Sequence, residues 1–425
     1  MAQQKKKQNA RQNPKVLAAQ YRNDFFRKMK LIIDCMCGKD IFPLIPSEIL
    51  NKIYLQRCTP FKIVPGHGSN ISDKFLKKIK VILPALIKKQ FVTLSPSTPQ
   101  ISLSDFYTVV LTIPMIDAHI SDTSFKHADR VKAALKLFCD TVSDNEDAYI
   151  HMQKVLCAYC FGDSDLREVL YWLKHDIDFP ESHRGEVENN IRINTVTPEI
   201  IHLNIDGSSR PAIRVGWAFA SSGALWTTIK PSALGIKHSF AEIPLKVYMQ
   251  KHALNRLMER IDCFWVGLIQ FNMYVSLFEP KIAYDSNKNL LIEYSFFNTK
   301  AGYFRADIVD GIILLRTFLF VTNNGTPEGQ LLEKNTGLQK MDKMYLSIDK
   351  LSTFMNSDLD KNDEVQRLFK NSGCQCLIDL YNNMKPLLTK TDNDFHFDLM
   401  LSYLNLNSSN TIADTAQVAL QLEND

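Results

Sequence analysis

The chain has 425 residues, of which 45% are hydrophobic and 23% are charged, so it falls among ordinary globular proteins and has room for two or three domains. Its net charge of +4 is too small to predict a polyanion partner for the whole molecule. No stretch of about 18 apolar residues lacks charges and no secretory signal is visible, so we expect a cytoplasmic protein without a membrane partner.

The charge is unevenly distributed. The first 30 residues contain nine Lys or Arg against one Asp, whereas the last 86 contain 13 acidic residues against eight basic ones. Residues 1–13 have almost nothing to bury, so we expect a disordered basic tail, with weak nucleic-acid affinity as the alternative interpretation.

Residues 14–180 are predicted to form a helical domain, because apolar residues recur at spacings of three and four. Pro84 is expected to kink or divide one helix. The predicted helices cover 14–38, 47–56, 72–91, 104–120, 125–142, 145–161 and 164–175.

The nine cysteines are scattered and odd in number, which favours reduced thiols. Cys157 and Cys160 have the internal spacing of a zinc ligand pair, but no second pair follows at a usual distance. We therefore expect buried thiols there, and we predict neither a metal nor another cofactor.

A polar segment at 180–190 is a candidate linker. After it, the spacing of the apolar residues changes from a helical pattern to one typical of strands. Short runs rich in Ile, Val, Trp and Thr predict an antiparallel sheet, and a helix over 246–261 interrupts the strands. The predicted strands are 191–197, 200–205, 212–219, 224–229, 244–249, 281–284, 290–296, 301–309 and 312–322.

Strong turn chemistry at 323–329 ends this run of strands, so residues 190–340 are expected to form an α+β domain with the candidate active site. Residues 341–425 are expected to form a helical C-terminal region. Its predicted helices are 347–355, 363–369, 374–384, 394–404 and 412–422. The predicted fold class is therefore α+β, with a helical N-terminal domain, a central antiparallel sheet and C-terminal helices.

The helix over 246–261 carries the main candidate site. At about 100° per residue, its polar side chains His252, Arg256, Glu259 and Arg260 share one third of the circumference, and apolar residues cover the opposite side. One side of the helix can pack while the other presents an imidazole, two guanidiniums and a carboxylate. The alternative interpretation is an ordinary solvated face of an amphipathic helix.

The pattern His252-x-x-x-Arg256-x-x-Glu259-Arg260 precedes a strand meander whose last strand carries Arg316-Thr317. It resembles the barnase/EndoU/colicin/RelE-like group of ribonucleases and toxins, over residues 246–337. The resemblance implies a metal-independent endoribonuclease, acting as a toxin or phage-defence effector, that cleaves RNA through a 2′,3′-cyclic phosphate.

Such cleavage needs a base for the 2′-hydroxyl, an acid for the leaving oxygen and cations for the phosphorane. His252 would be the acid or base, Arg256 and Arg260 would hold the phosphate, and Glu259 would orient an Arg or share proton transfer. Because strand side chains alternate, only one of Arg316 and Thr317 is expected to face the site.

Two tyrosines are candidate RNA-binding residues. Tyr294 and Tyr303 could stack on a base or donate to a phosphate, although packing is the more common role for either.

Two other functions stay open: a non-enzymatic interaction or structural protein, in which the helix face makes salt bridges to the acidic C-terminal region, and a nucleic-acid-binding protein without catalysis. An Arg256 or Arg260 buried against a carboxylate would favour the structural role. Convergence of His252, Arg256 and Arg316 on an open cleft would favour the enzyme.

Overall fold

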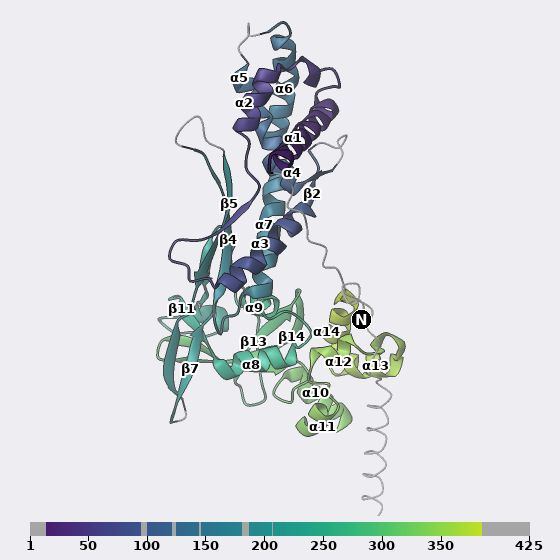
Figure 1. The fold of residues 1–425 in the computed structure, drawn as a ribbon. Helices are drawn as coiled ribbons and strands as arrows, with labels where there is room; N and C mark the ends of the chain where they lie inside the picture. The colour runs from purple at the N-terminus through teal and green to yellow at the C-terminus, as the bar shows by residue number, and fades with distance from the viewer. Residues whose placement is uncertain are drawn as a thin grey trace, which may run out of the picture. The chain divides into compact units, whose positions relative to one another are not determined.

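The computed structural model describes residues 14–94, 100–120, 125–143, 146–180, 187–205 and 207–384, and the fold is α+β as predicted (Figure 1). The expected basic tail at 1–13 and the helices expected at 394–404 and 412–422 lie outside the described residues. The chain forms two compact units. The first, here the N-terminal unit, comprises Met1–Tyr159 and Trp172–Thr195, and the second, the C-terminal unit, comprises Cys160–Tyr171 and Val196–Asp425.

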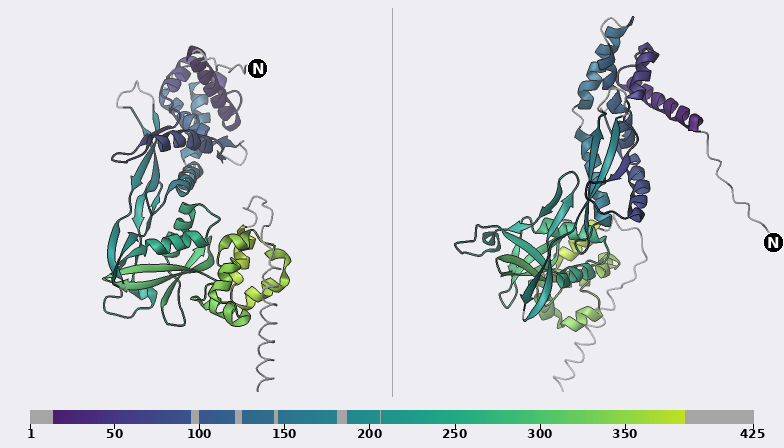
Figure 2. Two further views of the ribbon diagram at one scale, coloured as in Figure 1. Left: turned by 60° about the horizontal axis from the view of Figure 1, so that its bottom comes forward. Right: turned by 60° about the vertical axis from the view of Figure 1, so that its left-hand side comes forward.

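Helices dominate the N-terminal unit, drawn in purple and blue in Figure 2. Helix α1 buries Phe25, Met29, Ile32 and Ile33 at the spacing that the sequence predicts. The α-helices are α1 (Pro14–Met36), α2 (Ser47–Leu55), α3 (Asp73–Lys88), α4 (Leu103–Thr108), α5 (Pro114–His119), α6 (Ala128–Ser143) and α7 (Glu146–Asp163), and the 3-10 turns are η1 (Phe42–Leu44) and η2 (Val110–Thr112).

Two proline-containing segments differ from their predictions. Helix α3 continues through Pro84 without division, and Ser72 caps it by accepting a hydrogen bond from the Phe75 backbone N–H. The single helix expected over 104–120 is instead α4, η2 and α5, with Pro114 at the start of α5. A proline suits a first helical turn, which explains the break.

The helix predicted over 164–175 is wrong, because β4 (Leu170–Asp178) is a strand, and the N-terminal region is therefore not all-helical. Strand β4 belongs to a sheet of order β1-β5-β4, in which β1 (Lys62–Pro65) is parallel to β5 (Glu188–Val196). Ion pairs join β4 to β5, with Arg192 contacting both Asp176 and Asp178. This pairing with the next strand along the chain overrides the local helical spacing. A short hairpin of β2 (Phe91–Val92) and β3 (Ile101–Ser102) completes the strands of this unit.

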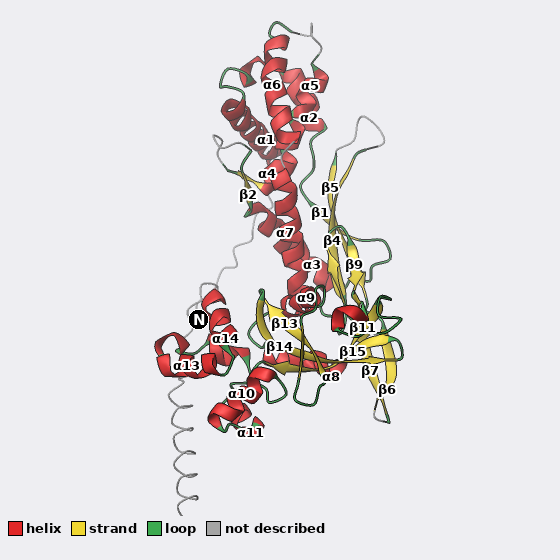
Figure 3. Ribbon diagram, turned by 180° about the vertical axis from the view of Figure 1, so that it is seen from behind, coloured by secondary structure: helices red, strands yellow, loops and turns green. Residues whose placement is uncertain are grey.

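The C-terminal unit is built on an eight-stranded sheet of order β12-β13-β14-β15-β11-β7-β6, with β10 paired to β11 (Figure 3). Most neighbours are antiparallel as predicted, but β11 and β15 are parallel, so the sheet is mixed. Its strands are β6 (Ile200–Ile205), β7 (Ser208–Arg214), β10 (Thr228–Ile229), β11 (Leu245–Gln250), β12 (Ile282–Tyr284), β13 (Leu290–Phe296), β14 (Thr299–Val309) and β15 (Ile312–Phe320), and a separate hairpin contains β8 (Gly216–Phe219) and β9 (Gly223–Trp226).

Helices follow the central strands and end the described chain. Helix α10 was not predicted, because it begins inside the segment 323–329 that was interpreted as a turn. Two residues of that segment start the helix: Thr326 accepts a hydrogen bond from the Gly329 backbone N–H, and Pro327 occupies the first helical position. The helical elements of this unit are η3 (Pro231–Leu234), α8 (Lys251–Arg260), α9 (Val266–Ser276), α10 (Pro327–Thr336), α11 (Lys340–Tyr345), α12 (Leu351–Met355), η4 (Leu359–Lys361), α13 (Asp363–Asn371) and α14 (Gln375–Met384).

Candidate functional site

Helix α8 follows β11 directly and packs against β15. Its apolar side, made by Ala253, Leu254 and Leu257, is buried, whereas the His252 side chain is exposed. The side chains of Arg256 and Glu259 are 40% and 54% exposed. The predicted division of this helix into a packed and a polar side is therefore confirmed for these residues.

Arg256, the exposed cation of the predicted motif, is already paired. The Arg256 guanidinium donates to Glu259 Oε2 at 2.8 Å, one helical turn along. An exposed pair at this spacing contributes only about 0.3–0.5 kcal/mol. Glu259 therefore orients Arg256, as the sequence analysis allowed, but it also neutralises the charge that a phosphate would need.

Arg260 lies in a different environment from the other polar residues of α8. It forms an ion pair with Asp349, and the two side chains are only 14% and 8% exposed. Next to this pair, Asp262 accepts hydrogen bonds from the Ser352 backbone N–H at 3.0 Å and from the Ser352 hydroxyl at 2.7 Å. Arg260 and Asp262 thus hold the segment that leads into α12 against the end of α8.

Burial dominates the electrostatics of Asp349. Burial raises the pKa of Asp349, and the nearby charges of Arg260, Lys350 and Arg256 lower it by less. Ionised Asp349 is therefore less favourable here than in water, in spite of its partner. Arg260 cannot turn to a substrate without leaving this carboxylate buried and unpaired.

Arg316 lies at a β-bulge of β15. Arg305 pairs with Thr317 and Ala306 pairs with Leu315, so Arg316 is the extra residue. Strict alternation does not hold at a bulge, and the expectation that Arg316 and Thr317 face opposite sides was based on a regularity that is absent here. The Arg316 guanidinium donates to Asp307 on the neighbouring strand at 3.0 Å.

The two candidate RNA-binding tyrosines belong to the core. Tyr294 is fully buried, its hydroxyl donates to the Ile269 carbonyl at 3.2 Å, and burial raises its pKa well above the ordinary value. Tyr303 is 4% exposed and its hydroxyl donates to Glu328 at 2.9 Å. Neither ring can stack on a base in this structure, so the RNA-binding role is wrong for both, and packing, the more common role, is the one they have.

Sequence analysis missed a buried lysine close to the end of α8. Lys343 is 2% exposed, and its ammonium donates to Asn324 Oδ1 at 2.7 Å and to the Gly329 carbonyl at 2.8 Å. Burial lowers its pKa to about 8. With Arg260 and Asp349 it lines a cavity of about 10 Å³, roughly enough for one water molecule. No local signal marks this residue, since a lysine in a short polar helix is normally solvated.

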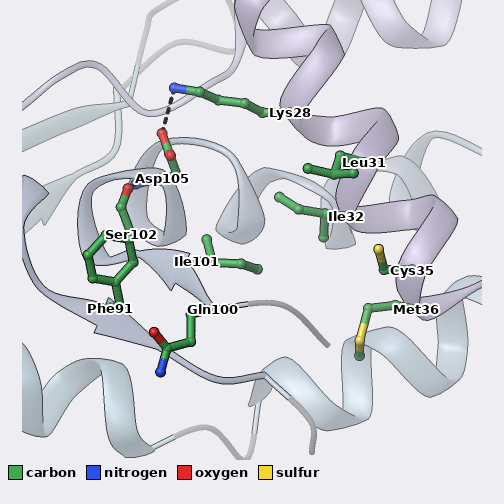
Figure 4. Close-up of a pocket in the computed structure, with 10 residues that line it drawn as sticks. All are labelled: Lys28, Leu31, Ile32, Cys35, Met36, Phe91, Gln100, Ile101, Ser102 and Asp105. Carbon is green, nitrogen blue, oxygen red and sulfur yellow. Dashed lines mark hydrogen bonds and ion pairs between the residues drawn. The ribbon is translucent and has the colours of Figure 1, made fainter. Parts of the chain in front are cut away.

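Two larger cavities lie away from α8. One, of about 200 Å³, lies in the N-terminal unit between α1 and the β2–β3 hairpin and is mainly apolar, with Lys28 and Asp105 paired at 2.8 Å (Figure 4). The other, of about 210 Å³ in the C-terminal unit, is polar and lies where α9 ends beside β13. It is lined by Asn272, Val275, Ser276, Glu279, Lys281, Glu293, Ser295 and Asn298.

Within the residues that the structure describes, no group of three or more His, Cys, Asp or Glu side chains is placed to hold a metal ion. Cys157 is half-buried and Cys160 is buried, and neither forms a disulfide. None of the described helices is long and apolar enough to cross a membrane.

The geometry therefore brings His252, Arg256 and Glu259 together on an exposed helix face. It assigns Arg260, Tyr294 and Tyr303 to internal contacts and pairs Arg316 with Asp307. Comparison with protein-family models, with curated proteins and with solved structures finds no match to this chain.

Proposed function

We propose that the protein acts by binding rather than by catalysis, and that α8 is an internal anchor that joins the sheet to the C-terminal helices. One observation supports this most directly. Each guanidinium of the candidate site already has a carboxylate partner: Arg256 with Glu259, Arg260 with Asp349, and Arg316 with Asp307.

Metal-independent RNA cleavage depends on cations that stabilise charge as it develops on the phosphorane. A guanidinium paired with a carboxylate offers much less net charge to that oxygen than an unpaired one. The buried pair is the stronger obstacle, because moving Arg260 toward a substrate would abandon Asp349 in a site that is 8% exposed. The arrangement therefore favours an interaction or structural protein.

A metal-independent endoribonuclease, as a toxin or defence effector, is the second candidate. It is favoured by the exposed imidazole of His252, which lies one turn before Arg256 on the same solvent-facing side of α8. His252 could serve as the general acid or base, and Arg256 could leave the weak exposed pair with Glu259 to bind a phosphate. Nucleic-acid binding without catalysis would use the same exposed side chains.

The experiment is cleavage of labelled oligoribonucleotides in EDTA, combined with gel-shift binding, by wild type, His252→Ala and Arg256→Ala. Lys251→Ala is the matched control, because Lys251 is exposed on the same helix outside the motif. We expect no cleavage by any of the four proteins, all equally folded. EDTA-resistant cleavage that leaves a cyclic phosphate, lost in His252→Ala and Arg256→Ala but kept in Lys251→Ala, would overturn the proposal and establish the enzyme. RNA binding without cleavage would assign the nucleic-acid-binding function.

A further inference from the structure

Helix α3 of the N-terminal unit has an unusually basic exposed side. It buries Ile79, Leu83 and Ile87, and every lysine of the segment 73–89 is exposed. These lysines are Lys74, Lys77, Lys78, Lys80, Lys88 and Lys89, against a single acidic residue, Asp73. Among the described residues, Lys74, Lys77, Lys80, Lys88 and Lys89 have no carboxylate partner, so their charge is available to an external anion.

Aliphatic side chains are exposed between these lysines. Val81 is 73% exposed, Ile82 is 38% exposed and Leu86 is 37% exposed. At about 100° per residue, Val81 lies opposite the buried stripe of Ile79, Leu83 and Ile87, Ile82 lies about a right angle from it, and Leu86 borders it. Val81 and Ile82 are in the middle of the helix, with lysines before and after them. The exposed side of α3, here the α3 surface, is thus a lysine-rich face with Val81 at its centre and Ile82 on its flank.

We infer that the α3 surface binds an anionic lipid surface, with the lysines at the phosphate headgroups and Val81 and Ile82 at the boundary with the acyl chains. Lysine clusters beside exposed aliphatic residues on one helix are the pattern of helices that lie on anionic membranes. The contact is peripheral, because α3 also packs into its own unit through its buried stripe.

The composition of the α3 surface distinguishes this partner from the two other anionic classes. Nucleic-acid surfaces combine lysine and arginine contacts to phosphates with arginine forks and aromatic stacking on the bases. The segment 73–89 has no arginine, and its one aromatic residue, Phe75, is only partly exposed. Exposed aliphatic side chains would gain nothing from a phosphate backbone. Protein interfaces are depleted in lysine and enriched in aromatic residues and arginine, which α3 does not offer.

The test is sedimentation of the full-length protein with vesicles of phosphatidylcholine alone or with one third phosphatidylglycerol, over a series of salt concentrations. The variant Lys74→Gln/Lys77→Gln/Lys88→Gln removes three unpaired lysines of α3. The control Lys237→Gln/Lys334→Gln/Lys361→Gln removes the same charge from exposed sites in the C-terminal unit. A third variant, Val81→Ser, removes only aliphatic surface.

We expect binding to the anionic vesicles only. Each α3 lysine should contribute about fivefold, so the triple α3 variant should bind about a hundredfold more weakly than wild type. The control variant should bind almost as wild type does. Val81→Ser should weaken binding while leaving its salt dependence unchanged, since that dependence arises from charge.

Three results would overturn the inference. Equal losses in the α3 and control variants would mean that only net charge matters. No binding by folded wild type would remove the lipid surface as a partner. Binding of an oligoribonucleotide that the α3 variant loses, without vesicle binding, would assign the α3 surface to nucleic acid instead. None of these results depends on whether α8 is catalytic.

Discussion

The buried pair of Arg260 and Asp349 gives the sharpest test of whether the polar side of α8 is structural. Replacing Arg260 by Met keeps most of its length and removes its charge, which leaves Asp349 buried without a counter-ion. Removing one partner of a buried pair typically costs about 3–5 kcal/mol of unfolding free energy. Exposures of 14% and 8% place this pair in that class.

The raised pKa of Asp349 predicts the result of removing both charges. The penalty that burial imposes on ionised Asp349 is larger than the stabilisation from Arg260 and the other nearby charges. The intact pair therefore contributes little net stability. The double variant Arg260→Met/Asp349→Leu should therefore unfold within about 1 kcal/mol of wild type, or be more stable, although each single variant loses several kcal/mol. The coupling between the two positions should be large and favourable.

Urea unfolding of the four proteins, followed by far-UV circular dichroism and tryptophan fluorescence, measures this cycle. The exposed pair provides the control, because Arg256→Met should change the unfolding free energy by less than about 0.5 kcal/mol. If Arg260→Met proved no more destabilising than Arg256→Met, the structural interpretation of Arg260 would fail. The same conclusion would follow if Arg260→Met kept full stability and abolished an RNA-cleaving activity present in wild type.

Two further predictions concern the C-terminal unit. The pKa of Lys343 is lowered from 10.5 to about 8, so between these pH values the unfolded chain binds more protons than the folded one. The free energy of unfolding of wild type should therefore rise by roughly 3 kcal/mol relative to that of Lys343→Met as pH rises through this window. A difference that did not change with pH would refute the burial argument. A Cβ on Gly267 would lie 2.3 Å from the Phe161 carbonyl oxygen, so Gly267→Ala should lower the midpoint of urea unfolding by the equivalent of about 1–3 kcal/mol, whereas Gly162→Ala, with open space around it, should be neutral or stabilising.

Local sequence patterns were sufficient for most of the C-terminal unit. Alternation of apolar residues and the turn at 285–289 identify β12 and β13, and Asp310 and Gly311 have the positive φ that the turn between β14 and β15 requires. Strand β4 was missed because its conformation depends on pairing with β5, the next strand along the chain. The spacing of apolar residues within one segment cannot predict pairing with another strand.

The alternation along β13 supports the packing role that the sequence analysis names as the more common one for Tyr294. Ile292, Tyr294 and Phe296 share one face of the strand, and all three are fully buried. A tyrosine flanked at i−2 and i+2 by large apolar residues belongs to the same core face. Tyr294 could therefore have been assigned to packing from the sequence alone.

The candidate site failed to follow from the sequence for a different reason. Helical period determines which side chains share a face of α8, and that part was right for His252, Arg256 and Glu259. Helical period does not determine which carboxylate from another part of the chain pairs with each arginine. Asp349 is 89 residues beyond Arg260. Asp307 contacts Arg316 where a β-bulge places Arg316 out of register. Because a guanidinium serves a phosphate or a carboxylate equally well, the residue type alone could not choose between catalysis and anchoring. The choice depends on the partner, and the partner is determined by the tertiary fold.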